Sequence, residues 1–136
     1  MTTAPTAPPP ARRSTGRRLL FGLFVLIVVI LGVIALYVWA ALHISYSEGD
    51  RAGYVQKFSR KGWICKTWEG ELAMVNLPGT LPQIFQFSVR DAAVAEQMNK
   101  TLGQRVRLHY EQHKGIPTTC FGETEYFVTE VEPVAP

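Results

Sequence analysis

The sequence has 136 residues and a formal net charge of +3, so it holds at most one small domain beside any membrane segment. Four of its 14 Lys and Arg residues precede position 19, and all 11 Asp and Glu residues follow position 45. The chain beyond position 18 therefore carries ten cations against 11 anions, a formal charge of −1. This balance excludes the basic surface that nucleic-acid-binding domains present.

Residues 1–18 are rich in proline and arginine and have no large apolar residue after Met1. Such a segment buries too little apolar surface to offset the entropy lost on ordering. We expect a disordered cytoplasmic tail here. Its basic residues would lie near anionic lipid headgroups, and they are Arg12, Arg13, Arg17 and Arg18.

Residues 19–42 are 24 consecutive positions without a charged residue, Ser, Thr, Asn, Gln or Pro. A helix of that length measures about 36 Å, which exceeds the roughly 30 Å hydrocarbon core of a bilayer. The run has no polar face, which a helix at the surface of a soluble protein needs. We predict one transmembrane helix over 19–44. The alternative is a cleaved signal peptide, whose apolar core spans only about 7 to 15 residues.

The charges beside this helix predict its orientation. The four arginines precede it, whereas the acidic residues Glu48 and Asp50 follow it. The positive-inside rule then places the N-terminus in the cytoplasm and the chain from about position 45 outside. In a bacterium, which is the setting we assume, this is an inner (cell) membrane protein with a periplasmic C-terminal domain.

The rest of the chain predicts a small, mostly β domain over 53–132, after a polar linker at 45–52 and before a proline-rich tail at 133–136. Alternating apolar and polar residues predict strands, and Gly and Pro mark the turns between them. The expected strands cover 54–59, 63–74, 83–89, 104–112 and 123–131.

One helix is expected over 91–103, between the third and fourth strands. Asp91 is a suitable N-cap and Gly103 a suitable C-terminal residue. Five strands with a helix at this position are typical of an OB-fold, a five-stranded, partly open barrel. A long second strand bent at Gly70 suits such curvature. A small α+β sandwich of the same elements is the alternative.

Cys65 and Cys120 are the two cysteines of the chain, and both lie in the outer domain. An even pair in an oxidising compartment is usually a disulfide, and the loops that carry these two flank the same face of an OB-fold. Such a bridge encloses about 55 residues and contributes about 4 kcal/mol in the chain-entropy model. Two buried free thiols, or a redox-active pair without a Cys-x-x-Cys motif, are the alternatives.

Candidate ligand contacts lie near these loops and on the fourth strand. Trp63 follows a turn and Phe121 follows Cys120, so they are candidates for an aromatic platform. Arg105 and Arg107 share the outward face of the fourth strand and form a weak candidate patch for an anionic ligand. A solvated strand face is the alternative interpretation of these arginines.

Catalytic and metal-binding patterns are weak. Glu69 and Glu71 lie about 7 Å apart on one strand face, a carboxylate separation found in some glycosidases, but no other feature supports catalysis. His109, His113 and Cys120 look like a set of metal ligands. If the fourth strand runs through His113, however, the two histidines lie about 13 Å apart, which is too far for one zinc ion to bind both. Nucleotide-binding loops of the Walker and dinucleotide types are missing from the sequence. We expect no enzymatic activity, no cofactor and no metal site.

The segments YSEGDRAG (46–53), KFSRKG (57–62) and KTWEGEL (66–72) resemble a family of small single-pass bacterial membrane proteins of unassigned function. Members are sometimes labelled 6-phosphogluconate dehydrogenase. This chain does not support that label, because it lacks the dinucleotide loop and cannot hold a Rossmann domain plus a substrate domain outside the membrane. The resemblance implies no site residue.

Together these features favour a non-enzymatic, membrane-anchored, OB-like module that binds or scaffolds a protein or cell-envelope partner outside the cytoplasm. One alternative is a thiol redox factor or small envelope enzyme that uses Cys65 and Cys120. Another is an accessory subunit of a larger membrane complex.

Overall fold

The computed structural model describes residues 1–10, 15–74 and 77–134. The chain divides into two compact units, Met1–Leu36 and Tyr37–Pro136. Two of the expected topology residues, Arg12 and Arg13, lie outside the described residues, as do the last two positions of the expected tail.

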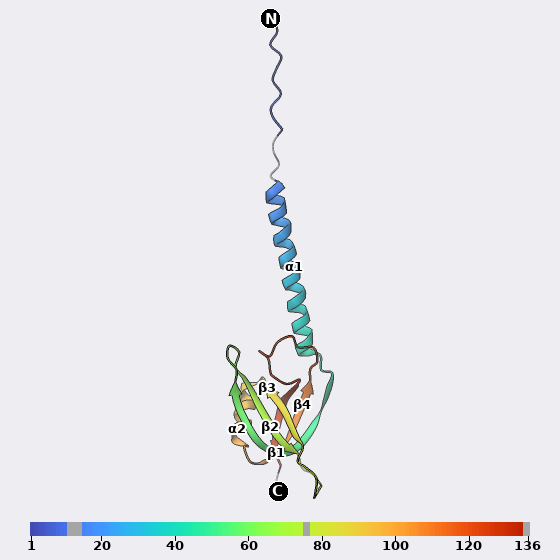
Figure 1. Cartoon of the computed structure of the whole chain (residues 1–136), viewed down its shortest axis with the longest axis vertical. Helices are drawn as coiled ribbons and strands as arrows, with labels where there is room; N and C mark the ends of the chain where they lie inside the picture. Colours follow the sequence, from blue (N-terminus) through green and yellow to red (C-terminus); the bar gives the residue numbers. More distant parts are fainter. Residues whose placement is uncertain (11–14, 75–76, 135–136) are drawn as a thin grey trace. The chain divides into compact units, whose positions relative to one another are not determined.

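Helix α1, Thr15–His43, has 29 residues, none of them buried (Figure 1). The predicted apolar helix is therefore confirmed, although it begins four residues earlier than expected because Arg17 and Arg18 are good helix formers and extend it. Its length and composition fit a membrane anchor or a signal sequence.

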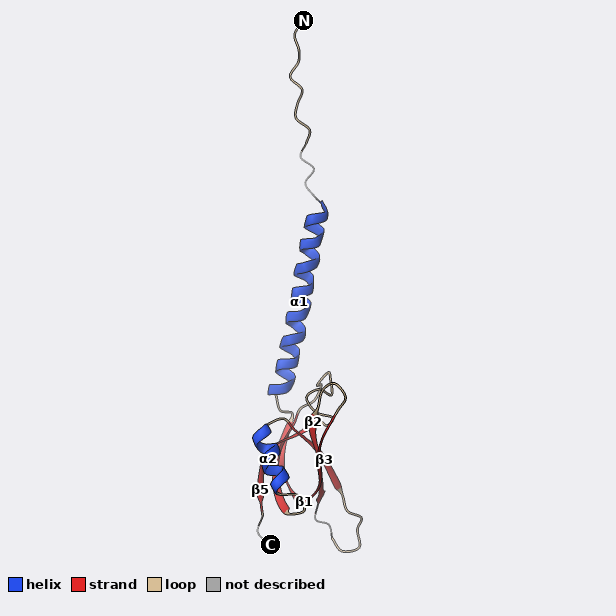
Figure 2. Ribbon diagram, turned by 90° about the vertical axis from the view of Figure 1, so that its left-hand side faces the viewer, coloured by secondary structure: helices blue, strands red, loops and turns tan. Residues whose placement is uncertain are grey.

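The second unit contains five strands and one further helix, in the predicted order. They are β1 Ser47–Lys61, β2 Thr67–Met74, β3 Ile84–Val89, α2 Ala92–Lys100, β4 Arg105–Gln112 and β5 Tyr126–Pro133. The strands close into a ring in the order β1-β2-β3-β5-β4. Figures 1 and 2 show this unit from two sides. Every neighbouring pair is antiparallel except β3 and β5, which run parallel.

Strand β1 corrects the expected linker at 45–52. It has 15 residues; its first half pairs with β4 and its second half pairs with β2. Residues 47–52 look like a linker because their side chains are polar and stay at least partly exposed. They form a strand because β4, far away in the sequence, supplies the hydrogen-bonding partners.

Two strand boundaries also differ from the prediction. Strand β2 begins at Thr67 because residues 62–66 form a turn, in which Gly62 has a φ of +136°. Strand β5 begins at Tyr126 and continues into the expected tail, where Pro133 pairs with Val106. A proline is tolerated at this position because it lies at a strand end.

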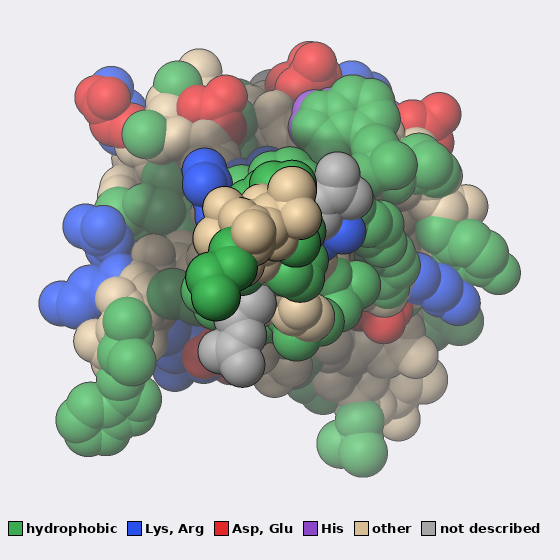
Figure 3. Space-filling model, turned by 90° about the horizontal axis from the view of Figure 1, so that it is seen from above, with side chains coloured by type: hydrophobic (Ala, Val, Ile, Leu, Met, Phe, Trp, Pro, Cys, Tyr) green, Lys and Arg blue, Asp and Glu red, His purple; other side chains and the backbone are tan. Residues whose placement is uncertain are grey.

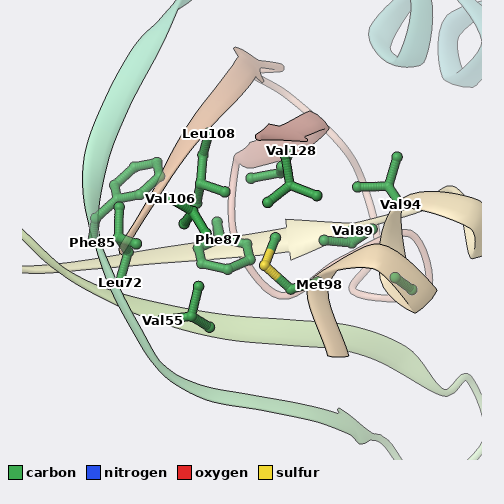
Figure 4. Packing of buried hydrophobic residues seen from close by; sticks show 12 residues of the cluster. Val55, Leu72, Phe85, Phe87, Val89, Val94, Met98, Val106, Leu108 and Val128 are labelled. Atoms are coloured by element: carbon green, nitrogen blue, oxygen red, sulfur yellow. The ribbon is translucent and has the colours of Figure 1, made fainter. Parts of the chain in front are cut away.

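The core fills the inside of the ring (Figure 4). Its largest side chains with no exposed surface are Phe87, Leu72, Met98 and Leu108. Helix α2 adds apolar side chains to the same cluster. Asp91 caps this helix as predicted, because its carboxylate accepts a hydrogen bond of 2.8 Å from the Ala93 amide.

Gly70 lies where β2 crosses over the core. An added Cβ there would collide with the ring of Phe87, which is completely buried and cannot move aside. Gly70→Ala should therefore lower the free energy of unfolding by about 2 kcal/mol through overpacking. Urea unfolding of the full chain in detergent checks this. The matched control is Gln86→Ala on the exposed face of β3, which should change stability by less than about 0.5 kcal/mol.

Candidate functional site

A disulfide joins the two loops at one end of the ring. The turn at 62–66 connects β1 to β2, and the loop at 113–125 connects β4 to β5. Cys65 in the turn is bonded to Cys120 in the loop, with their Cα atoms 4.9 Å apart. The predicted disulfide is confirmed, and it fixes the two loops to each other. We call this pair of joined loops the stapled rim.

Glu69 of β2 holds the stapled rim together through buried hydrogen bonds. Its side chain is 6% exposed. Its Oε1 accepts hydrogen bonds from Thr67 Oγ1 (2.7 Å) and from the Glu123 amide (2.9 Å), and its Oε2 accepts one from Ser88 Oγ (2.6 Å). These bonds join β2, β3 and the 113–125 loop through one carboxylate. The sequence pairs Glu69 with Glu71 and does not indicate this role, because two of the donors come from distant segments.

Two further contacts hold the loop at the rim. Ser88 Oγ accepts a hydrogen bond from the Thr124 amide at 3.1 Å. Lys61 Nζ lies 2.8 Å from Glu123 Oε2, and this hydrogen bond raises the pKa of Lys61 above its usual value. The loop is therefore held by a covalent bond, a buried carboxylate and an exposed ion pair.

A shallow groove runs over the outer face of β1, β2 and β3 beside the stapled rim. It has a volume of about 50 Å³ and a polar lining. Cations, carboxylates and neutral donors all contribute to it: Lys57, Ser59, Lys61, Glu71, Gln86 and Thr124. The groove therefore presents both charges and neutral polar groups at the surface of these strands.

Trp63 and Phe121, the predicted aromatic contacts, lie in the two loops of the rim. The Trp63 side chain is completely exposed, whereas Phe121 is half-buried. Behind Trp63 the rim forms a hollow of about 350 Å³, whose lining includes Thr119 and Cys120. A ligand-binding role for Trp63 and Phe121 stays a prediction.

Arg105 and Arg107 lie on β4, and both are exposed. Arg107 Nη2 donates a hydrogen bond of 2.7 Å to Glu132 Oε2 on β5. Arg105 begins β4, whereas the loop of the stapled rim follows the other end of that strand. The structure therefore does not bring this arginine pair to the rim, and its binding role stays a prediction.

The histidines have partners of their own. His109 Nδ1 lies 2.9 Å from Asp50 Oδ1 on β1. His113 is buried, and its Nδ1 lies 3.1 Å from the carbonyl oxygens of both Ala41 and Ile44. In the part of the chain that the structure describes, no group of three or more His, Cys, Asp or Glu residues is placed to hold a metal ion.

The pair of His109 and Asp50 should make stability depend on pH. The hydrogen bond to Asp50 raises the pKa of His109 above 6.5. Protonated His109 therefore stabilises the fold below about pH 6.5, and this contribution disappears as the pH rises through the folded pKa. Both side chains are partly exposed, so the effect should stay under about 1 kcal/mol.

Unfolding of the full chain at about pH 5.5 and about pH 8.5 measures this effect. Asp50→Asn should lose stability relative to wild type at the lower pH and match it at the higher pH. The control is Glu96→Gln, which removes an exposed helical ion pair with Lys100 and should show the same small change at both values. An equal loss for Asp50→Asn at both pH values would contradict the prediction.

Arg51 lies against aromatic side chains at the inner side of β1. Its guanidinium carbon is 4.6 Å from the centre of the Phe85 ring and 5.6 Å from that of Tyr110. Its Nη1 lies 3.1 Å from Met74 Sδ, and its Nε is the one buried side-chain nitrogen or oxygen without a hydrogen-bond partner among the described residues. Arg51 was not among the predicted site residues, because it falls in the expected linker at 45–52.

No curated protein matches the chain. One family model matches residues 45–136, which is more than half of the sequence and includes every strand of the ring. This agrees with the resemblance to a family of unassigned function, while the bacterial source and the single membrane pass stay predictions. The chain belongs to the family described as domain of unknown function (DUF8785).

Proposed function

We propose that this protein is a membrane-anchored, non-enzymatic module that binds a protein or cell-envelope component outside the cytoplasm of a bacterium. The observation that carries the proposal is the Cys65–Cys120 disulfide, because structural disulfides persist in oxidising compartments and are rare in the cytosol. The apolar helix supports it, since arginines lie on one side and acidic residues on the other.

We further infer that the ring of strands is an OB-fold. Three features support this: the strand order β1-β2-β3-β5-β4, the single parallel pair of β3 and β5, and the helix after β3. OB-folds bind ligands on the face of their second and third strands, between the β1–β2 and β4–β5 loops. Here those loops form the stapled rim, and the polar groove lies beside it.

The side chains around the groove favour binding over catalysis. The inside of the ring is filled by the core, so a partner would contact the outer face. The buried carboxylate of Glu69 already accepts three hydrogen bonds from the protein, which leaves it poorly suited to acid–base chemistry. The lining of Lys57, Glu71 and Gln86 suits an extended polar segment such as a peptide of a partner protein.

Surface labelling of intact bacterial cells tests the location. A tag at the C-terminus of the full chain should react with a membrane-impermeant reagent, and alkylation with mass spectrometry should find Cys65 and Cys120 oxidised. Reaction in lysed cells alone would place the domain in the cytoplasm and refute the proposal.

Partner capture tests the groove. The full chain, purified in mild detergent, should retain a stoichiometric partner that Glu71→Lys releases. Glu96→Lys changes charge equally on α2, outside the groove, and should retain the partner. Equal retention by both variants would exclude the groove as the binding face. A partner held through the apolar helix alone would instead identify an accessory subunit of a membrane complex.

A thiol redox factor is the second candidate, because the Cys120 side chain is exposed and therefore accessible to another thiol. Titration with a mild reductant separates the two functions. A structural disulfide should resist reduction until the domain unfolds. A pair that is reduced and reoxidised readily in the folded domain would favour redox activity.

A further inference from the structure

The 62–66 turn exposes two large apolar side chains next to each other. Trp63 is 101% exposed and Ile64 is 97% exposed. Single apolar residues on a surface need no explanation, but this pair is held out on a rigid support. The disulfide fixes one side of the turn, and the ion pair of Lys61 with Glu123 fixes the other.

The turn lies at the end of the second unit where the chain enters it. Tyr37 donates a hydrogen bond of 2.7 Å to the Gly115 carbonyl, and the buried His113 contacts the carbonyl of Ile44. Both partners belong to the 113–125 loop, which the disulfide joins to the turn. The entry segment, the loop and the turn therefore share one end of this unit, and the apolar run of α1 stops at Leu42, two residues before Ile44.

This end combines apolar and cationic side chains. Besides the turn, Trp39, Ile44 and Tyr46 are each more than half exposed. Figure 3 looks onto this end and shows hydrophobic side chains standing out among Lys and Arg, with Asp and Glu side chains also present. The exposed cations are Arg60, Lys61, Lys66 and Lys114.

The exposed side chains at this end of the unit complement the surface of a bilayer. Trp and Tyr favour the interface between lipid and water, and Lys and Arg favour anionic headgroups. Within the described residues, no ion pair engages Arg60 or Lys66. Arg60 lies 5.9 Å from the centre of the Trp68 ring, a contact that does not neutralise its charge, so both cations can pair with a headgroup. Lys114 lies 4.0 Å over the Tyr46 ring, which leaves its charge at the same surface.

We propose that Trp63 and Ile64 insert into the interfacial region of the bilayer that anchors the chain, with Arg60 and Lys66 on anionic headgroups. The turn is then a second membrane contact, which limits how the domain turns about its anchor. The proposal rests on the membrane anchoring in the proposed function. It does not depend on which side of the membrane the domain occupies, because on either side the 62–66 turn would contact the leaflet that faces the domain.

Fluorescence quenching by brominated lipids tests the insertion. The full chain is reconstituted into vesicles of phosphatidylcholine and phosphatidylglycerol, with Trp39→Phe and Trp68→Phe leaving Trp63 as the sole tryptophan. Bromine on the acyl chains should remove most of the Trp63 emission, and aqueous iodide should remove little. In the control, Trp63 is also replaced by Phe, and Tyr54→Trp places the sole tryptophan opposite Arg105, at the start of β4. This control should show the opposite result.

A second comparison covers a folding defect from the loss of Trp68, which stacks on Phe58 at 5.1 Å. Here Trp39 and Trp68 stay in place, and bromine quenching is measured for the wild type and for Trp63→Ser. The difference between the two is the quenching that is due to Trp63. Arg60→Gln combined with Lys66→Gln should weaken the quenching of Trp63 in phosphatidylglycerol vesicles. Unchanged quenching would overturn the role of the two cations.

Three results would overturn the insertion. Emission quenched by iodide and not by bromine would place Trp63 in water. Emission shielded from both, and dependent on the protein-to-lipid ratio, would place it against a second copy of the chain. Protein that fails to float with the vesicles would overturn the anchoring itself, and so is distinguishable from an anchored protein whose Trp63 stays in water.

Discussion

Replacing both Cys65 and Cys120 by alanine should lower the free energy of unfolding of the strand-ring domain by about 4 kcal/mol. The disulfide spans a sequence separation of 55 residues, and closing a loop of that length removes much entropy from the unfolded chain. Domains of this size are stable by only about 5 to 15 kcal/mol in total. The loss should therefore leave a marginal fold.

Urea unfolding of the full chain in detergent measures this loss, with tryptophan fluorescence as the probe. Wild-type protein kept in a strong reductant should unfold at the same urea concentration as the double variant. The control is Thr119→Ala beside Cys120, which should behave like the wild type. A difference below about 1 kcal/mol would contradict this, and would show that the unfolded chain already keeps the two loops close without the bond.

Glu69→Ala should lower the free energy of unfolding by about 3 kcal/mol. The substitution removes the acceptor of three hydrogen bonds, from Thr67, Ser88 and the Glu123 amide. Each buried donor left without a partner costs about 1 to 3 kcal/mol. The full sum is not expected, because Ser88 Oγ also lies 2.8 Å from Thr124 Oγ1 and retains one partner.

Matched variants separate this role of Glu69 from a general effect of charge. Glu71→Ala removes a partly exposed carboxylate two residues along β2 and should cost less than about 1 kcal/mol. Glu69→Gln keeps one acceptor oxygen and should lie between the two. Equal costs for Glu69→Ala and Glu71→Ala would show that the three hydrogen bonds contribute no net stability.

The losses from removing Glu69 and the disulfide should not be additive, because both hold the 113–125 loop. Once the disulfide is missing, the loop has more freedom, and Glu69 has less ordered structure to stabilise. A double-mutant cycle of Glu69→Ala with the paired cysteine substitutions should give a coupling energy of about 0.5 to 3 kcal/mol. Strict additivity would mean that the disulfide and the hydrogen bonds of Glu69 hold different parts of the stapled rim.

The sequence predicted the parts of this protein whose causes are local. The apolar run predicted α1, because 24 apolar positions need no distant partner to define them. Asp91 and the apolar stripe after it predicted α2, because caps and helical spacing act within a few residues. The alternation of apolar and polar residues predicted the five strands approximately. The disulfide was predicted from the even pair of cysteines, together with a strand order that places their two loops on the same face.

Only the tertiary structure decided what depends on segments far apart in the chain. Residues 47–52 form a strand because β4 pairs with them, and nothing in their own polar pattern indicates this. Glu69 holds a loop rather than forming a carboxylate pair with Glu71. It does so because Ser88 and the Glu123 amide, 19 and 54 positions away, donate hydrogen bonds to its carboxylate. Periodicity reports which face of an element is apolar, whereas the closure of the ring determines which polar side chains meet.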